Sequence, residues 1–522
     1  MTLWITIPLL LLASASPTLT LLKLWQLKEW RPDRLREHMA RESWLKQLFG
    51  WLRPSILGIW FVSGMIVVPL SGFSPYILQQ WGVFLLLILA ALTCAQYGSR
   101  KQPMPVWTGK AAALTALSLF FPALAGLLID SFLQEPANVL VIALLPYFAP
   151  VFIVLAWLAL KPADIVLKRR IIAQAIALRN SHPRLTVIGV TGSVGKTTTK
   201  ELLAHVLKSL NAVATPVHLN TEIGVARWLI SLLKDLSANQ TKIIIVEMGA
   251  YRTGEIDLLT RITVPQLGIV TYIGNQHLSL FGSSEAIQTA KGELLRALPE
   301  NGHAFLNSDN EAFSALRAMC RCRVTSVGTD GHADVTAFDV EETLSGLKFR
   351  ALDTSFEVPI AGTHNVTSVL LAIAVARHLN IPVREIQTSL RTFAPLKHTF
   401  EVQSVRGVTV LDDTYNLSPM SFRAATDWAR QQPHRHKILL TDGIIELGSK
   451  ESEIHRSLAG SAATVFDTAY IVSPHFLPYF RDGGFGERAK SASVSLPIEP
   501  GDLLVCAGRL PRSLIERLLP PV

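Results

Sequence analysis

The sequence predicts an N-terminal α-helical transmembrane bundle followed by an α/β part, and two observations lead to this prediction. Of the 522 residues, 49% are hydrophobic and only 17% are charged, whereas an average soluble domain has about 25% charged residues. The excess of apolar residues lies before about residue 160, and from about residue 184 short β-branched runs alternate with stretches typical of helices. At roughly 150 residues per domain, the length corresponds to about three folding units.

The membrane prediction rests on apolar segments that mostly approach the roughly 20 residues a helix needs to cross a bilayer. The first resembles a signal peptide because Ala13 to Ser16 are small, but Met1 to Trp4 include no Lys or Arg, so we expect this segment to be retained. Residues 1–160 are therefore expected to form a transmembrane domain of about five helices, with segments at 3–22, 56–78, 82–97, 111–133 and 138–160.

The loop charges predict the orientation of these segments. Lys and Arg residues interleaved with tryptophans fill the loop from Lys23 to Arg53, and Lys161 to Arg170 follow the last segment. The positive-inside bias therefore places both regions in the cytoplasm and the N-terminus outside. We expect a multi-pass protein of the cytoplasmic (inner) membrane, with the rest of the chain in the cytoplasm.

The basic loop is expected to be an interfacial amphipathic helix held by anionic headgroups, with a substrate-docking surface as the alternative. Binding to anionic lipid headgroups thus accounts for much of the net charge of +9, and no nucleic-acid partner is expected.

The four cysteines form no CxxC pair, which excludes a four-thiolate zinc ribbon. They are also too few for a disulfide framework, as fits a reduced cytosolic setting.

A phosphate-binding loop is predicted where the buried strand 185–190 meets a helix expected over 200–210. Between them stand Gly192, Ser193, Val194, Gly195, Lys196, Thr197 and Thr198. Glycines let backbone N–H groups approach phosphates, Lys196 can reach the terminal phosphates, and Thr197 offers a hydroxyl to Mg²⁺. Because Val190 occupies the position of the first glycine of the G-x4-G-K-[ST] pattern, the loop is a shorter TGxxGKT form. The loop therefore predicts a phosphate-containing ligand with Mg²⁺.

Three further β-branched runs, 242–246, 267–271 and 408–411, are predicted as buried strands of α/β sheets. Glu247 follows the first of these runs, and an acidic side chain at the end of a strand beside a phosphate loop is a natural Mg²⁺ ligand.

A series of ordered motifs follows residue 184. They are TGSVGKTTTKE at 191–201, NTEIG at 220–224, EMGA at 247–250 with GEI at 254–256, TYIGNQHL at 271–278, AKGE at 290–293, LNSD at 306–309, GTHN at 362–365 and DDTYN at 412–416. These motifs resemble those of the Mur ligase family, the ATP-dependent amide ligases of peptidoglycan precursor synthesis. The resemblance covers about residues 184–522 and is strongest to the members that add D-alanyl-D-alanine, and it implies ATP as a cofactor beside Mg²⁺.

The resemblance implies a linker at 161–183, a central ATP-binding domain at 184–357 and a doubly wound, Rossmann-like C-terminal domain at 358–522. It also implies the reaction, in which a carboxylate takes the γ-phosphate of ATP and the resulting acyl phosphate is attacked by an amino acid or dipeptide. In such a reaction positioning and charge neutralisation supply most of the rate.

Individual roles follow from the same resemblance. Lys196, His277 and Lys291 are expected to be catalytic. Thr197 and Glu247 would hold one metal ion, and His277 and Lys291 a second, with Lys291 carbamylated by CO₂. Asn307 would hydrogen-bond adenine and Asp413 would contact the nucleotide from the C-terminal domain. Without the resemblance, a lysine in AKGE would be read as a solvated charge, and Asn307 and Asp413 as turn residues.

The sequence departs from the family at both ends. Thr399 stands where the family usually has arginine, and Ser368, Ser418 and Cys506 replace two asparagines and a lysine near the incoming amine. The acceptor can therefore differ from D-alanyl-D-alanine. Residues 1–183 show no resemblance to the UDP-binding domain of soluble members, so we expect the carboxylate substrate at the cytoplasmic membrane face, either UDP-linked or undecaprenyl-linked.

Two other functions remain open at this stage. One is a membrane-associated ligase of another polymer, such as poly-γ-glutamate, which differs in the amine that it accepts. The other is a non-catalytic scaffold that binds ATP and envelope enzymes. The presence of Lys196, Thr197, Glu247, His277 and Lys291 favours a working ligase over the scaffold.

Overall fold

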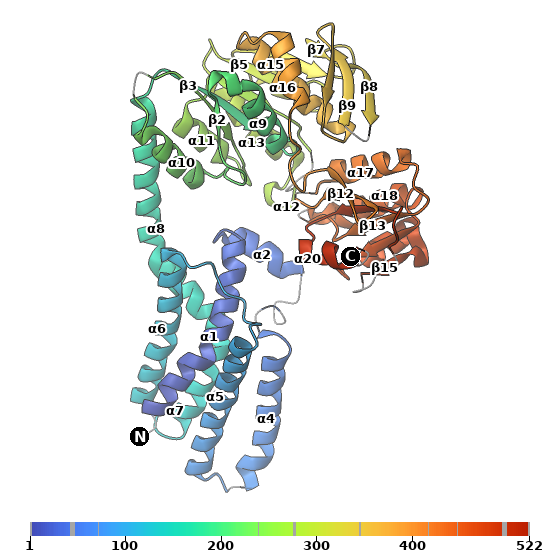
Figure 1. The fold of residues 1–522 in the computed structure, drawn as a ribbon. Helices are drawn as coiled ribbons and strands as arrows, with labels where there is room; N and C mark the ends of the chain where they lie inside the picture. Colours follow the sequence, from blue (N-terminus) through green and yellow to red (C-terminus); the bar gives the residue numbers. More distant parts are fainter. Residues whose placement is uncertain are drawn as a thin grey trace. The chain divides into compact units, whose positions relative to one another are not determined.

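The computed structural model describes residues 3–41, 47, 49–70, 72–237, 240–274, 278–343, 346–415, 417–445, 447–492 and 498–519. The chain forms two compact units, residues 1–169 and 170–522 (Figure 1). Each unit has hydrophobic clusters of its own, because the residues of every cluster come from one side of this boundary.

The first unit consists of helices. Among the described residues, five helical stretches are long and apolar enough to cross a membrane, which agrees with the number of apolar segments in the sequence. Two of them, α1 and α5, pack against each other, and α1 also contacts α6. The helices are α1 (Leu3–Leu27), α2 (Pro32–Arg41), α4 (Leu52–Leu70), α5 (Pro75–Gly98), α6 (Gly109–Phe132), α7 (Ala137–Leu144), η1 (Leu145–Phe148) and α8 (Ala149–Asn180).

The boundary between the second and third apolar segments differs from the sequence prediction. The expected break at 79–81 lies inside α5, and the chain turns instead at 72–74. Gly72 and Phe73 have positive φ angles of 60° in this turn, and Pro75 starts α5 with a φ already suited to a helix. Hydropathy alone could not place this turn, because the residues on both sides of it are equally apolar.

The bundle has an apolar core and one largely uncovered helix. Leu10 of α1, Leu85 and Leu89 of α5 and Ile142 of α7 are fully or almost fully buried. In α4, by contrast, only 6% of the apolar window is buried, and Ile59 and Met65 are exposed. Such an apolar surface fits contact with lipid chains.

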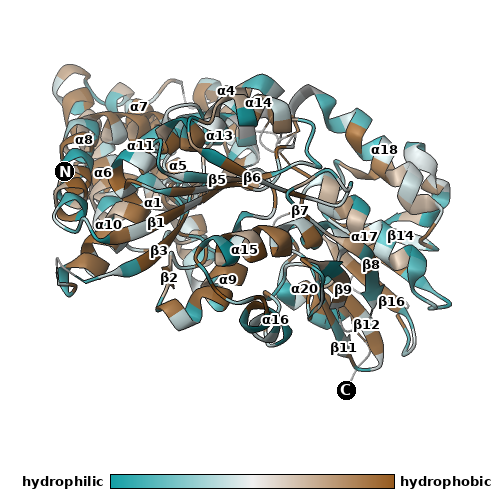
Figure 2. Cartoon of the chain, turned by 90° about the horizontal axis from the view of Figure 1, so that it is seen from above, coloured by the Kyte–Doolittle hydropathy of each residue, from teal (hydrophilic) through white to brown (hydrophobic). Residues whose placement is uncertain are grey.

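The central part of the second unit contains a parallel sheet of seven strands in the order β2-β3-β1-β4-β5-β6-β7. Its strands are mostly hydrophobic in Figure 2, as expected for a sheet covered on both faces. The strands are β1 (Leu185–Thr191), β2 (Val213–Ala214), β3 (Lys242–Glu247), β4 (Leu267–Val270), β5 (His303–Asn307), β6 (Arg323–Gly328) and β7 (Val335–Thr336).

Helices cover the two faces of this sheet. Helices α9 and α15 contact each other and bury one side, while α10, α11 and α13 contribute to the clusters on the other. These helices and the shorter ones between the strands are α9 (Lys196–Val206), η2 (Leu207–Leu210), α10 (Glu222–Lys234), α11 (Glu255–Thr263), α12 (Leu278–Phe281), α13 (Ser284–Ala297), α14 (Phe313–Ala318), η3 (Thr363–Asn365), α15 (Val366–His378) and α16 (Val383–Arg391). The helix predicted over 200–210 thus begins four residues earlier, at Lys196.

A small antiparallel sheet, β10-β9-β8, follows the central one. Its strands are β8 (Phe338–Thr343), β9 (Gly346–Ala351) and β10 (Thr354–Val358). Phe349 and Phe356 stack across it and join the cluster that contains α15.

The C-terminal part holds a sheet of six strands in the order β11-β12-β16-β13-β14-β15, in which only the β11–β12 pair is antiparallel. Its strands are β11 (Glu401–Val405), β12 (Val408–Asp413), β13 (Lys437–Thr441), β14 (Thr468–Ile471), β15 (Ala489–Ser491) and β16 (Leu503–Ala507). Its helices are α17 (Pro419–Gln431), η4 (Gly448–Lys450), α18 (Glu451–Ala463), α19 (Leu477–Phe480), η5 (Arg481–Phe485), η6 (Gly486–Arg488) and α20 (Arg512–Leu518). Clusters on both faces make it a covered α/β sheet, as predicted.

The last turns of α8 belong to the second unit and are fixed there by Arg179. This side chain is only 3% exposed. Its Nε donates to the Thr263 carbonyl at 2.8 Å and its Nη1 to the His182 carbonyl at 2.9 Å, and Nη2 reaches the carbonyls of Leu185 and Val264. One guanidinium thus joins the end of α8, the start of β1 and the end of α11.

We predict that Arg179→Met lowers the free energy of unfolding of the second unit by about 3 kcal/mol, because several buried carbonyls lose their donor. Urea unfolding of the full chain in detergent, followed by tryptophan fluorescence, measures the change. Arg170→Met is the control, since Arg170 is exposed on the same helix. Equal stability of the two variants would contradict the role given to Arg179.

Candidate functional site

The loop between β1 and α9 is shaped by two glycines and by the end of β4. Gly192 has a φ of 146° and Gly195 a φ of 84°. A Cβ on Gly192 would lie 2.0 Å from the Thr271 Oγ1 atom, so no side chain fits there. The Ser193 amide donates to the Tyr272 carbonyl at 2.6 Å, and Thr271 Oγ1 donates to the Val194 carbonyl at 2.5 Å. The loop is therefore held against the residues that follow β4.

Lys196 starts α9, and its side chain turns back over this loop. Its Nζ donates to the carbonyls of Gly192 and Ser193 at 2.7 and 2.9 Å. Burial lowers the pKa of Lys196, although the carboxylate of Glu247 acts in the opposite direction. A cation surrounded by backbone groups of a glycine-containing loop at a helix N-terminus is suited to bind phosphate oxygens.

Glu247 lies at the end of β3, next to the first residues of α9. The sheet pairs Val190 of β1 with Glu247, so the two strands end together. Glu247 is 2% exposed, and its Oε2 accepts a hydrogen bond from Thr197 Oγ1 at 3.0 Å. Its Oε1 accepts from Asn220 Nδ2 at 3.0 Å. A carboxylate and a hydroxyl this close, beside a phosphate-type loop, are the oxygen donors that Mg²⁺ prefers.

A second lysine, Lys200, is fully buried and lies next to the Glu247 carboxylate. Its Nζ donates to the Thr215 carbonyl at 2.8 Å and lies 3.7 Å from Glu247 Oε2. The Thr215 hydroxyl in turn accepts from the Glu247 amide. No functional role was predicted for Lys200 from the sequence. The sequence shows that Lys200 follows Lys196 by four residues, one helical turn later. Its distance to Glu247, however, depends on the pairing of β1 with β3.

Lys291 is buried on α13, which differs from the solvated position that the AKGE segment suggests by itself. It is 3% exposed, lies 5.8 Å from the centre of the Phe281 ring, and reaches the Ala250 carbonyl at 3.4 Å. Burial, reinforced by Lys196, lowers the pKa of Lys291 to about 7, while Glu255 and Glu293 act against the shift. A large share of neutral amine near pH 7 makes this lysine a nucleophile.

A pocket of about 160 Å³ adjoins the loop. Asn307, at the end of β5, faces it together with loop residues Val194 and Gly195. Asn307 is the residue that was expected to contact adenine. It lines the same pocket as the phosphate loop. The remaining lining residues are Thr271, Tyr272, Asp309, His364, Asn365, Thr367, Ser368, Leu371 and Met420. Tyr272, His364 and Leu371 are pocket residues that the sequence analysis did not single out.

Three other expected site residues have different outcomes. Thr198 is 4% exposed on α9. Asp413 lies at the end of β12, is 4% exposed, and is not among the pocket residues in the described part of the chain. Burial raises the pKa of Asp413 to about 6. His277 lies outside the described residues, so its role as a metal ligand stays a prediction.

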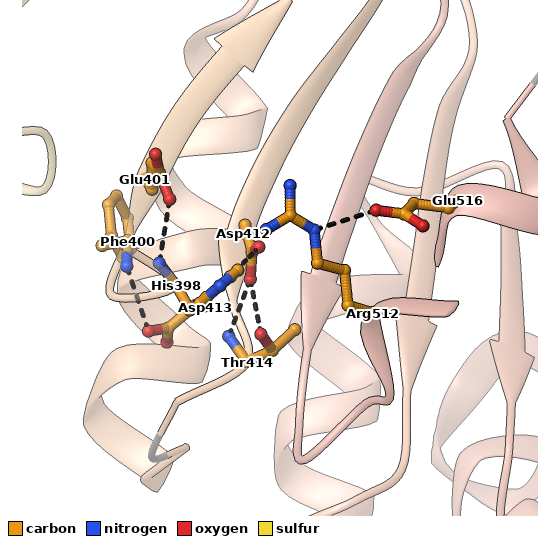
Figure 3. Close-up of polar contacts among 8 residues, drawn as sticks. All are labelled: His398, Phe400, Glu401, Asp412, Asp413, Thr414, Arg512 and Glu516. Atoms are coloured by element: carbon orange, nitrogen blue, oxygen red, sulfur yellow. Dashed lines mark hydrogen bonds and ion pairs between the residues drawn. The ribbon is translucent and has the colours of Figure 1, made fainter. Parts of the chain in front are cut away.

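Figure 3 shows polar contacts around the end of β12. His398 Nδ1 lies 2.7 Å from Asp412 Oδ2, and the His398 amide donates to Glu401 at 2.9 Å. The other oxygen of Asp412 accepts from the Thr414 hydroxyl at 2.6 Å. His398, Glu401 and Asp412 are potential metal ligands, and their ligand atoms lie within 4.8 Å of one another. Because His398, Glu401, Asp412 and Thr414 are linked by these hydrogen bonds, the cluster holds the segment before β11 against β12.

Of the residues that depart from the family motifs, Ser368 lies at the pocket, whereas Ser418 and Cys506 occupy structural positions. Ser368 Oγ lies 3.1 Å from where a Cβ of Gly195 would stand, and Ser368 lines the pocket. Ser418 caps α17 through a reciprocal pair with Ser421. Cys506 is fully buried in β16, and burial, with Asp412 nearby, raises the pKa of its thiol well above the usual range. A cysteine in this place cannot supply the positive charge of a lysine.

Comparison with known proteins supports the resemblance seen in the sequence. Residues 190–376 match the Mur ligase middle domain. The UDP-N-acetylmuramoyl-tripeptide–D-alanyl-D-alanine ligase of Mycobacterium tuberculosis is 36% identical over 314 residues, which are 58% of this chain and 60% of that enzyme. The enzyme of the same name from Bacillus subtilis is 32% identical over 275 residues, 52% of this chain and 58% of the relative. The chain thus spans about three fifths of the curated relatives that it matches.

Solved structures agree with this result. MurF from Acinetobacter baumannii superposes with a TM-score of 0.61 and 26% identity, over 67% of this chain and 80% of that one. The MurF ligase from Thermotoga maritima in complex with ADP gives a TM-score of 0.57 and 27% identity, over 67% and 82% of the two chains. The central and C-terminal α/β domains therefore have the Mur ligase fold.

We predict that Gly192→Ala weakens binding of Mg²⁺·ADP at least tenfold, because the added Cβ displaces the loop from Thr271. Isothermal titration of the full chain in detergent measures the affinity. Gly331→Ala is the matched control, since Gly331 also has a positive φ but no atom within 4 Å of its added Cβ. Unchanged ADP affinity in Gly192→Ala would show that this loop does not hold the phosphates.

Proposed function

We propose that this chain, a homologue of the Mur ligases through residues 190–376, is an ATP-dependent, ADP-forming ligase of peptidoglycan precursor synthesis. One observation carries the proposal: the phosphate-type loop with Lys196, the Thr197–Glu247 pair and a pocket ending at Asn307 lie together at one edge of the central sheet. Two oxygen donors, a cation and a pocket beside one loop suit a nucleoside triphosphate with its metal ion.

In the proposed reaction a carboxylate oxygen of one substrate attacks the γ-phosphorus of ATP and releases ADP. The amine of the second substrate then attacks the acyl phosphate, the C–N bond forms, phosphate leaves, and the amine loses a proton. Lys196 and the loop N–H groups would neutralise the phosphate oxygens as charge shifts between them. Asn307 would orient the base, so that the phosphates enter the loop in one direction.

The residues at the loop fit Mg²⁺. Thr197 Oγ1 and Glu247 Oε2 are 3.0 Å apart, both are oxygen donors, and Asn220 and Lys200 hold the carboxylate in place. Bound there, the ion would draw charge from the β- and γ-phosphates. The neighbouring Asn220 and Lys200 would keep the Glu247 carboxylate aimed at this position.

Lys291 fits the carbamate that the resemblance implies. Its amine is buried, partly neutral near pH 7 and close to Phe281, so attack on the carbon of CO₂ followed by proton loss would convert a cation into an anion. The anion would relieve the repulsion between Lys291 and Lys196 that contributes to the low pKa. With His277, it would hold the second metal ion.

The substrates follow partly from the relatives and partly from the first unit. The names of the relatives point to a UDP-N-acetylmuramoyl-tripeptide and D-alanyl-D-alanine. Cys506, Ser418 and Ser368 near the expected amine site favour testing other amino acids and dipeptides as well. The five helices of span length lead us to place the chain in the cytoplasmic membrane and the carboxylate at its inner face, UDP-linked or lipid-linked.

We expect Lys196→Ala to lower ADP release at least a hundredfold, because a developing phosphate charge loses its cation. The assay uses detergent-purified full chain with Mg²⁺ and bicarbonate, UDP-linked or lipid-linked muropeptides, and a panel of amines. Lys208→Ala is the control, since Lys208 is exposed just after α9. ADP binding without turnover on every substrate pair would identify a non-catalytic scaffold instead.

For Lys291, the carbamate should form as the pH rises through about 7, because only the neutral amine reacts with CO₂ and its pKa is about 7. Carbon-13 NMR of the full chain with labelled bicarbonate would show a carbamate signal that is weak at pH 6 and stronger at pH 8. The signal should be absent in Lys291→Ala, whose activity should fall and recover partly with added acetate. Full wild-type activity in CO₂-depleted buffer, without a carbamate signal, would refute this role.

A further inference from the structure

Arg53 is a charged residue buried in the helical bundle of the first unit. It stands in the first turn of α4, a helix of span length, and is 5% exposed. Its Nη2 donates to Gln96 Oε1 on α5 at 3.1 Å, and its own carbonyl accepts from the Tyr147 hydroxyl at 3.0 Å. A guanidinium stays protonated at any physiological pH, so α4 brings a full positive charge into the bundle.

Neutral polar side chains from other segments converge on the same place. Ser16 Oγ on α1 donates to the Gln96 oxygen at 2.5 Å. Gln102 Nε2, from the loop after α5, donates to the Ser16 carbonyl at 3.3 Å and to Thr20 Oγ1 at 3.1 Å. These residues, Ser16, Thr20, Arg53, Gln96 and Gln102, form the Arg53 cluster. It joins α1, α4, α5 and the loop after α5, and its residues are up to 86 positions apart in the sequence.

The Arg53 cluster lacks a negative charge. Among the described residues, no carboxylate forms an ion pair with Arg53, and its Nε is buried without a hydrogen-bond partner. Burying a charge without a counter-ion costs several kcal/mol, and ionisable residues within membrane helices are as a rule paired or functional. Packing alone does not explain an arginine here, because a leucine or methionine would fill the same space at lower cost.

The position of the cluster indicates which anion would complete it. Arg53 is in the first turn of α4, Gln96 in the last turn of α5, and Gln102 in the loop that follows. All three therefore lie at the ends of the spans, on the side where the loop carries Arg100 and Lys101. If these helices span a bilayer, their ends would lie at the depth of lipid headgroups. The planar guanidinium matches phosphate oxygens in a two-bond geometry.

We propose that the Arg53 cluster binds the phosphate group of a lipid at the basic end of the bundle. The guanidinium Nε and Nη groups donate to the phosphate oxygens, and the Gln96 side chain holds the guanidinium plane in position. The site takes a phosphate monoester or diester on an apolar chain, which enters from the bilayer. It stands independently of the proposed ligase reaction, because it uses residues of the first unit alone.

The test measures lipid binding to the full chain in a neutral maltoside detergent by native mass spectrometry. The probes are dodecyl phosphate, phosphatidylglycerol, laurate as an anion without phosphate, and inorganic phosphate. We expect wild type to prefer the two lipid phosphates over laurate and to bind inorganic phosphate weakly. Arg53→Gln should lose about tenfold or more in affinity for the lipid phosphates, and Arg53→Lys should lie between the two.

Lys101→Gln is the matched control, because Lys101 is exposed at the same end of the bundle; it should bind like wild type. Helix content by circular dichroism separates lost binding from a misfolded variant, and if Arg53→Gln misfolds, Arg53→Lys carries the comparison. Equal affinity in wild type and the Arg53 variants would overturn the site. So would an equal loss in Lys101→Gln, equal binding of laurate, or inorganic phosphate binding as tightly as the lipid phosphates.

Discussion

The parallel pairing of β1 with β3 and β4 is the constraint on which the candidate site depends. Val190 pairs with Glu247, and Thr191 pairs with Val270, so the three strands end at the same edge of the sheet. The phosphate-type loop, the carboxylate and the residues after β4 therefore meet, although they come from distant parts of the sequence. In open α/β sheets this carboxyl edge is where ligands bind. A change of register by one residue would turn Glu247 away from Thr197.

Close packing of charged groups is the second feature that the site and the fold share. Lys200 and Lys291 are buried and Lys196 is half-buried. Glu201 lies 2.9 Å and Glu247 3.7 Å from Lys200 Nζ, and the Glu247 carboxylate also acts on Lys196. In such surroundings the positive charges raise each other's energy. The arrangement is suited to a ligand with several negative charges, because phosphate oxygens would compensate the lysines. Stability and ligand binding are thus coupled at this edge of the sheet.

In the helical first unit, a few buried polar side chains specify how the helices pack. Most of its residues are apolar, and the hydropathy pattern does not specify which helix packs against which. The few buried polar groups therefore specify the contacts between the helices. Arg53, Gln96 and Ser16 form hydrogen bonds between α4, α5 and α1. Hydrogen bonds of this kind fix how membrane helices associate, because apolar side chains gain little from leaving a lipid environment. The polar cluster therefore both orders these helices and provides a place for an anion.

The sequence by itself determined the order of the parts, the number of apolar helices, the strand–loop–helix arrangement that begins at residue 185 and the resemblance to the Mur ligases, because these depend on local composition and short motifs. It also pointed to Glu247 as a residue at a strand end, and through the LNSD motif to Asn307 as a residue that contacts the nucleotide. The tertiary structure determined the features that depend on spatial neighbours. Lys200 and Asn220 hold Glu247, and Lys291 is buried. Tyr272 and His364 line the pocket, and α5 begins at Pro75. Burial and hydrogen bonding depend on neighbours brought by strand order and helix packing, and no local pattern specifies those neighbours.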